Sequence, residues 1–382
     1  MVTDEKCGPT RTLAMLLFSL GPTVANAVNE AEAVPLDAYP LATCLDGSAA
    51  RYYLSRGDPN STTWLLYLEG GSFCASEAEC RKRSHGYLGT TKRDKSTMSL
   101  DEFYFSRDPL ASPLLSSAHH VYIRYCDGAY YSGERHEPVL NGSLPPLYHR
   151  GKWISEAVMA HLEAHQGLDQ ATDVVLAGCS AGAISLYAHI DAMRQLLPSS
   201  ARVVGFADSG FYLDVNGYAD AKKFVVAETG HNVSSMLSPQ CTAAHQAATE
   251  HCLVAQYSAQ YVRTPLFALQ SRYDLDQRTN LDDTCKQSSA CIEEYGQNLT
   301  RMLRSWMTSC LGVGVRHGAF MDGCERHCDG AANASLSDLF PLSMQVDGVT
   351  PLQSLARWHR GGVGSQTLWL QPGVYPCATC CG

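Results

Sequence analysis

The stretch "DVVLAGCSAGAISLYAHIDAM" (Asp173–Met193) decides the fold, because an apolar run and a helical pattern meet in it without an intervening loop. Asp173–Cys179 is rich in valine and other apolar residues, which predicts a buried strand. Over Gly182–Leu197 apolar residues recur at three- and four-residue spacing, which predicts an amphipathic helix. The join between them is a sharp turn centred on Ser180.

Ser180 has two possible roles at this turn, nucleophile or small residue in a tight corner. Gly178 and Gly182 stand two residues before and after it, where small residues relieve the steric cost of a strained turn. The following helix offers free backbone N–H groups and the positive end of its dipole. The pattern alone is common, but its place between a buried strand and a long helix favours the nucleophile.

The same alternation of strands and helices extends on both sides of this stretch. Further buried strands are expected at Trp64–Gly70, His119–Gly128, Ala201–Gly210 and Thr264–Ser271, and further helices at Trp153–His165 and within Ser289–Cys310. Tyr87–Ser116 looks irregular and suits a cap or pocket wall. Strands that alternate with helices indicate an α/β fold, a mostly parallel sheet flanked by helices. We expect one α/β-hydrolase-like, disulfide-rich domain over residues 28–382.

Composition excludes some classes of function. The chain of 382 residues is 45% hydrophobic, enough for a substantial core, and its net charge of −9 provides no basic face for nucleic acid. We therefore expect no nucleic-acid partner.

The N-terminus predicts secretion. Lys6 and Arg11 precede the apolar run Leu13–Val24, and Ala25-Asn26-Ala27 follows, so residues 1–27 read as a signal peptide cut after Ala27. The run is too short for a comfortable membrane span, and no other long apolar segment exists, so no stable membrane insertion is expected. Five N-x-S/T sequons agree with a secreted glycoprotein: Asn60, Asn141, Asn232, Asn298 and Asn333.

The sixteen cysteines lie along the whole chain, which favours disulfides in an oxidising compartment. Four pairs flank short segments and suggest small disulfide loops: Cys74/Cys80, Cys241/Cys252, Cys285/Cys291 and Cys324/Cys328. Zinc is the less favoured alternative, resting on Cys377-x-x-Cys380 and Cys324-x-x-His327-Cys328 without a second matching ligand pair. Removal of Cys7 with the signal peptide leaves an odd number, and Cys179 is our candidate for the free thiol.

A serine nucleophile needs a base and an orienting acid, which in α/β-hydrolases follow in the order Ser, Asp or Glu, His. For the acid, Asp274 lies nearest the end of the predicted strand Thr264–Ser271, Asp276 is the runner-up, and Asp208 remains possible by position. For the base, His317 and His327 are nearly level, and His359 is a third candidate. Disulfides beside His327 would fix its loop rigidly.

An oxyanion hole needs backbone N–H groups from an early loop and from the residue after the nucleophile. Leu68–Cys74 lies at the end of the predicted strand Trp64–Gly70, and its paired glycines allow the backbone to approach a substrate oxygen closely. We expect Gly71, Ser72 and Ala181 to be the donors. The alternative for the two glycines is a simple turn after a strand.

Taken together, these segments resemble the pectin acetylesterase family, which includes the Notum-type carboxylesterases of animals. The resemblance follows the family's order over nearly the whole mature chain and rests on Tyr67–Cys74, Val121–Gly133, Gly178–Gly182, Phe206–Asp214, Gln270–Asp274, Gly318–Cys328 and Tyr375–Cys380. "RYCDGA" and the terminal "YPC" look closer to the plant-type enzymes.

The resemblance implies a role for each candidate residue. It implies Ser180 as nucleophile, Asp274 as acid and His327 as base, with Gly71, Ser72 and Ala181 as the oxyanion hole. It also implies that Asp208 belongs to a structural "ADSG" segment. Two positions depart from the family: Ala183 replaces a second glycine, and Ser72 stands where Notum-type enzymes carry a tryptophan. The latter weakens any transfer of Notum's lipid specificity.

The sequence therefore predicts a secreted serine esterase that removes O-acetyl groups from pectin or a related cell-wall polysaccharide. This chemistry needs no cofactor and no metal, and we expect a monomer. Three alternatives remain open: a Notum-like protein-lipid (palmitoleoyl) carboxylesterase, a generic secreted lipase, and a non-catalytic secreted binding module.

Overall fold

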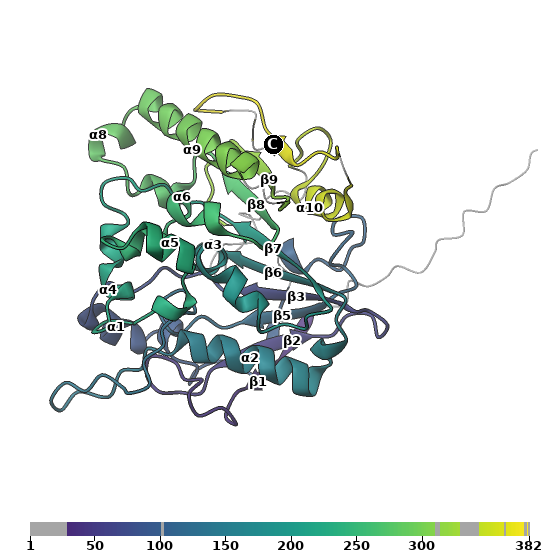
Figure 1. Cartoon of the computed structure of the whole chain (residues 1–382). Helices are drawn as coiled ribbons and strands as arrows, with labels where there is room; N and C mark the ends of the chain where they lie inside the picture. The colour runs from purple at the N-terminus through teal and green to yellow at the C-terminus, as the bar shows by residue number, and fades with distance from the viewer. Residues whose placement is uncertain are drawn as a thin grey trace, which may run out of the picture.

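The parallel strands around Ser180 belong to one large mixed sheet. In the computed structural model, which describes residues 29–100, 103–309, 314–328, 344–362, 364–377 and 380, the strands lie in the order β10-β9-β8-β7-β6-β3-β5-β2-β1-β4 (Figure 1). Their bounds are β1 Glu30–Pro35, β2 Arg51–Ser55, β3 Thr63–Leu68, β4 Thr97–Ser99, β5 His119–Ile123, β6 Asp173–Cys179, β7 Arg202–Asp208, β8 Leu266–Ser271, β9 Gly318–Asp322 and β10 Leu368–Leu370. The expected signal peptide lies outside the described residues.

The sheet is parallel from β10 through to β5 and antiparallel beyond it. β3 pairs in parallel with both β5 and β6, and β6, β7, β8, β9 and β10 continue the parallel ladder. β2, β1 and β4 extend the sheet as antiparallel strands. The predicted mostly parallel sheet is confirmed, and the five predicted strands correspond to β3, β5, β6, β7 and β8. The antiparallel extension is a feature that the sequence pattern did not reveal.

Helices lie on both faces of the sheet. Their bounds are α1 Glu77–Ser84, α2 Gly151–Gln166, α3 Ala181–Arg194, α4 Lys223–Val226, α5 Pro239–Ala244, α6 Ala255–Ser258, α7 Leu275–Arg278, α8 Asp283–Lys286, α9 Ser289–Ser309 and α10 Pro351–Arg360. The predicted helices correspond to α2, α3 and α9. Within the described part of the chain, no helix combines the length and the apolar character that a membrane crossing requires.

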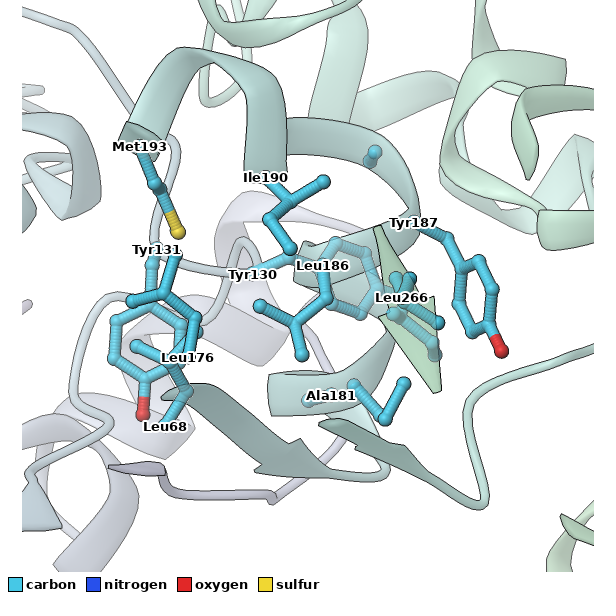
Figure 2. Close-up of a cluster of buried hydrophobic side chains, with 14 of the residues drawn as sticks. Leu68, Tyr130, Tyr131, Leu176, Ala181, Leu186, Tyr187, Ile190, Met193 and Leu266 are labelled. Atoms are coloured by element: carbon cyan, nitrogen blue, oxygen red, sulfur yellow. The ribbon is translucent and has the colours of Figure 1, made fainter. Parts of the chain in front are cut away.

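Alternate residues of the strands feed two separate hydrophobic cores, as the two-residue period of a strand requires. Leu66, Val174 and Leu176 point to the core beneath α2, α3 and α9, which Figure 2 shows around Leu186 and Ile190. Their neighbours Leu65 and Val175 point to the other core, which α10 and the short helical turn Phe103–Phe105 cover. The sheet is therefore buried on both faces, the arrangement expected of a parallel α/β sheet.

Close packing dictates the glycines around Ser180. A Cβ at Gly182 would lie 2.0 Å from the Leu68 carbonyl oxygen, and one at Gly178 would lie 2.6 Å from the carbonyl carbon of Gly182. A Cβ at Gly70 would lie 2.8 Å from the Cys179 carbonyl oxygen. Only glycine lets β3, β6 and the start of α3 approach so closely, and this contact places the loop after β3 directly beside Ser180.

The disulfides agree with three of the four expected short loops. Cys74–Cys80, Cys241–Cys252 and Cys285–Cys291 are bonded as predicted, and Cys44–Cys126 and Cys377–Cys380 form further bonds. The predicted Cys324–Cys328 pair is wrong, because Cys328 is bonded to Cys179. The prediction of a free thiol at Cys179 is wrong for the same reason.

Because Gly182 is so closely packed, we expect the addition of a single methyl group there to destabilise the fold. Gly182→Ala should lower the free energy of unfolding by about 1–3 kcal/mol in urea titrations, because the methyl group overpacks against β3. Alanine is the better helix former by about 1 kcal/mol, so helix propensity alone would give the opposite sign. In the control Gly362→Ala the added Cβ meets no atom within 4 Å. Equal stabilities of the two variants would contradict the packing argument.

Candidate active site

A cavity of about 660 Å³ lies at the carboxyl ends of the parallel strands. Its walls include Ser180, His327, and the adjacent Gly71 and Ser72, which come from three segments far apart in the sequence. Carboxyl ends of parallel strands are where α/β proteins bind their ligands. The cavity therefore brings most of the residues expected from the sequence to one place.

Ser180 occupies the turn between β6 and α3 in a conformation that non-glycine residues rarely adopt. Its φ is 53° and its ψ is −118°. Its N–H donates to the Asp208 carbonyl oxygen at 3.0 Å, and its own carbonyl accepts from Ile184 N–H at 2.8 Å, so both sides of the turn are fixed. Positive φ recurs at Ser72, Tyr130 and Cys328, which line the same cavity. Strained non-glycine residues gather at functional sites.

Asp274 holds His327 by its ring. The Nδ1–H of His327 donates to both carboxylate oxygens of Asp274, at 2.9 and 3.0 Å. The Asp274 side chain is fully buried, whereas that of His327 is 20% exposed. Burial disfavours the charged imidazole, but the Asp274 carboxylate outweighs it and raises the pKa of His327 above its usual value. With Nδ1 protonated, Nε2 is left as the proton acceptor.

The other two aspartates have different partners. Asp276 accepts a hydrogen bond from the Tyr212 hydroxyl at 2.6 Å and lines the cavity. Asp208 is fully buried, forms an ion pair of 3.0 Å with Arg326 and accepts from the Ser209 hydroxyl at 2.9 Å. The carboxylate beside the histidine is thus Asp274, the one favoured from the sequence.

The other two histidines lie away from the cavity. His317 is buried against the Trp306 ring, its Nδ1 accepts from Leu266 N–H at 3.2 Å, and burial lowers its pKa to about 4. His359, on α10, pairs with Asp173 at the opposite, amino end of β6 at 3.1 Å. Among these three, only His327 faces Ser180 across a shared space.

The loop after β3 presents backbone N–H groups at the cavity. In the described chain, neither the Gly71 nor the Ser72 N–H meets a protein acceptor. Ala181 is the first residue of α3, and an N–H at that position has no intrahelical partner. The three expected oxyanion donors are therefore free to bind a ligand oxygen.

Side chains behind this loop hold its carbonyl groups. The Arg83 Nη2 donates to the Gly71 oxygen at 2.6 Å, and the Tyr125 hydroxyl donates to the Ser72 oxygen at 2.6 Å. The Tyr125 N–H donates in turn to the buried Glu69 carboxylate at 2.7 Å, and Glu69 pairs with Arg124. Because a peptide unit is planar, the Arg83 contact with the Gly71 oxygen also fixes the direction of the Ser72 N–H.

An aromatic wall completes the cavity and was not assigned from the sequence. Phe73 packs on Tyr130 with ring centroids 5.6 Å apart, and Tyr212 stacks on Tyr218 at 4.9 Å. All four rings line the cavity. Behind the wall the buried Lys222 ammonium lies 3.1 Å from the Tyr218 ring centroid, and burial lowers its pKa. Several of these residues lie in the segments that carry the family resemblance, but aromatic residues in loops have many roles, so their composition alone gave no signal.

The cysteine and histidine groups are engaged in ways that do not suit zinc. In the alternative zinc set, Cys377 forms a disulfide with Cys380, and Cys328 forms one with Cys179. His327 is hydrogen-bonded to Asp274. Another close grouping of Cys74, Cys80 and His231 contains a disulfide as well. Disulfide sulfurs are not thiolates, which zinc requires from cysteine.

The His327–Asp274 contact predicts a measurable titration shift. In Asp274→Asn the pKa of His327, followed by NMR of the imidazole, should fall, since the charge that raises it is gone while burial remains. Asparagine can still cap α7, where Asp274 accepts from Gln277 N–H at 3.0 Å. His317 serves as an internal control with an unchanged pKa. An unshifted His327 would contradict the assigned contact.

Comparisons with known proteins identify the family of the chain. The sequence model of the family described as pectinacetylesterase matches residues 26–382. Pectin acetylesterase 5 of Arabidopsis thaliana is 30% identical over 361 residues, covering 89% of this chain and 82% of its own length. The palmitoleoyl-protein carboxylesterase NOTUM of Homo sapiens is 29% identical over 325 residues, covering 79% of this chain and 62% of its own. The chain therefore belongs to the pectinacetylesterase family and is a carboxylic ester hydrolase.

Proposed function

We propose that this protein is a secreted serine esterase that removes O-acetyl groups from pectin or a related acetylated polysaccharide. One observation carries the proposal: Ser180, on a strained strand-to-helix turn, shares a cavity with His327, whose ring is held by the buried Asp274. This is the constellation by which serine hydrolases are recognised, whatever their fold. Family membership supports the ester chemistry.

In the acylation step, Nε2 of His327 takes the proton of Ser180 as its Oγ attacks the ester carbonyl carbon. The resulting tetrahedral oxyanion accepts hydrogen bonds from the N–H groups of Gly71, Ser72 and Ala181. Such prearranged donors stabilise charge that develops only in the transition state. The histidine then gives its proton to the sugar oxygen, the C–O bond breaks, and the alcohol leaves.

In the deacylation step, a water molecule enters in place of the sugar. His327 takes its proton while the oxygen attacks the acetyl-Ser180 carbonyl. As the second tetrahedral intermediate collapses, the bond from Oγ to the acetyl carbon breaks, His327 returns the proton to Oγ, and acetate leaves. Asp274 keeps Nδ1 protonated and stabilises the imidazolium that forms in both steps. The carboxylate itself stays ionised throughout.

The lining of the cavity favours a polar substrate with a small acyl group. Polar and charged side chains stand among the aromatic rings, including Arg83, Asp276 and Asn280. Aromatic faces with a few polar groups suit a sugar, which has both apolar C–H faces and hydroxyl groups. A long acyl chain would desolvate these polar groups without pairing them, at about 1–3 kcal/mol for each.

Three features support secretion. The signal-peptide pattern of residues 1–27 precedes a single esterase domain, and disulfides join six pairs of described cysteines. Three of the sequon asparagines, Asn60, Asn141 and Asn298, have exposed side chains, as glycosylation requires.

Replacement of the nucleophile tests the proposal. Ser180→Ala should lower kcat for acetate release from acetylated pectin by about 10⁴–10⁶-fold, as loss of the nucleophile does in other triads. Ser354→Ala is the control, because it also removes a serine hydroxyl, but one that does not line the cavity. Ser354 is buried in α10, where its hydroxyl donates to the Pro351 oxygen at 2.6 Å. Near-normal hydrolysis by Ser180→Ala would overturn the proposal, and so would inactive wild-type protein, which is the result expected of a binding module.

The acyl preference separates this proposal from the alternative that the NOTUM relatives suggest. With matched soluble esters, kcat/KM should be at least about tenfold higher for acetyl than for a sixteen-carbon monounsaturated acyl group, a difference of about 1.4 kcal/mol in transition-state binding. Acetate release from acetylated pectin, xylan and rhamnogalacturonan, compared side by side, then identifies the preferred polymer. The reverse acyl preference would favour a protein-lipid carboxylesterase.

A further inference from the structure

The disulfide between Cys179 and Cys328 joins the two segments that carry Ser180 and His327. Cys179 immediately precedes Ser180 and Cys328 immediately follows His327, although 149 positions separate the two cysteines in the sequence. Their Cα atoms are 5.7 Å apart, and both residues line the cavity. We propose that this disulfide is a positioning crosslink for catalysis, which sets the place of His327 relative to Ser180. The inference rests on the proposed serine-esterase function.

The sheet order explains why His327 needs such a crosslink. His327 follows β9 and Ser180 follows β6, and in the sheet β8 and β7 lie between these strands. Three strand spacings amount to about 14 Å. The loop Gly323–Cys328 must therefore cross the ends of two strands before its histidine can reach the serine.

This crossing is anchored at each strand that it passes. Beyond β8, the Leu275 N–H donates to the Arg326 oxygen at 3.1 Å. At the end of β7, Arg326 pairs with Asp208 at 3.0 Å, and the Cys328 N–H donates to the Ser209 hydroxyl at 2.9 Å. The disulfide to Cys179 is the last anchor, at β6 itself. Unlike the other anchors named here, it is covalent, and it joins the loop directly to the residue before Ser180.

Chain-entropy stabilisation alone does not account for this placement. A disulfide stabilises a fold mainly by restricting the unfolded chain, and any bond closing a loop of this length would do so equally. Here the bonded residues are the immediate neighbours of the two reacting side chains. Cys328 also has a φ of 57°, a strained value for a non-glycine residue, which the bond and the Ser209 contact maintain. The pairing therefore constrains geometry as well as stability.

The positioning role is tested by removing the disulfide and measuring the activity of each reactive active site. In the pair Cys179→Ala with Cys328→Ala, active sites are titrated with a fluorophosphonate, and kcat is expressed per titrated site. We expect this kcat to fall by about ten- to a hundredfold, as small misplacements of catalytic groups do, with KM changed less than about threefold. The control pair Cys241→Ala with Cys252→Ala removes a disulfide that does not line the cavity and should keep the wild-type kcat per site.

A second measurement is independent of activity. The pKa of His327, followed by NMR, should fall toward that of an ordinary histidine when the crosslink is removed, because the ring is no longer held against Asp274. If the alanine pair fails to fold, Cys179→Val with Cys328→Ala restores volume at the end of β6, where valine suits a strand.

The outcomes separate the two proposals. Wild-type kcat per site and an unshifted His327 pKa in the folded variant would show that the disulfide only stabilises the fold, and would overturn the positioning role. Wild-type protein that neither reacts with the fluorophosphonate nor hydrolyses esters would instead refute the serine-esterase function.

Discussion

The parallel pairing of β3, β6, β7, β8 and β9 is the constraint on which the rest of the structure depends. Parallel strands end at the same edge, so the segments after these five strands meet there although they are up to about 260 positions apart in the sequence. The loop of Gly71, the turn of Ser180, Asp274 and His327 all belong to this edge. β3, β6, β8 and β9 each lead into one of these parts, and the end of β7 anchors the loop that carries His327 through Asp208 and Ser209.

Buried charges hold the loops at this edge in place. Arg326 lies between Asp208 and Asp322 at 3.0 and 2.8 Å, and Arg124 lies between Glu69 and Asp94. Burying such ions costs free energy, and replacing them by apolar residues is often neutral or stabilising in other proteins. Here each cluster supports a segment that lines the cavity: the Arg326 cluster lies beside His327, and the Arg124 cluster lies behind the loop of Gly71 and Ser72. We infer that the two clusters serve to hold these loops in position rather than to raise the stability of the fold.

Local patterns in the sequence were enough for the features that depend on neighbouring residues. The turn at Ser180 could be predicted because strand, glycines and helix are contiguous, and three short disulfide loops because both cysteines of each pair flank one segment. The positions of Asp274 and His327 needed the order of the triad and the family resemblance. The cysteines beside His327 left it nearly level with His317, because the deciding difference is the burial of His317 against Trp306, which local sequence does not reveal.

Features that depend on tertiary contacts could not be read from the sequence. Cys179 was expected to be a free thiol, because spacing does not reveal that a loop after β9 crosses to β6. Arg83 and Tyr125 contact backbone oxygens, and such contacts leave no pattern in residue types. β4 has only three residues, and β1 carries exposed glutamates that weaken its apolar pattern.

The central claim is that Ser180 is the nucleophile, and the most direct test is to identify the residue that a serine-directed reagent modifies. Wild-type protein is reacted with a fluorophosphonate, digested, and mapped by tandem mass spectrometry. We expect one phosphonyl adduct per chain, on Ser180, formed more slowly when His327 is replaced by alanine. An adduct on another residue, or the same rate of labelling without His327, would contradict it.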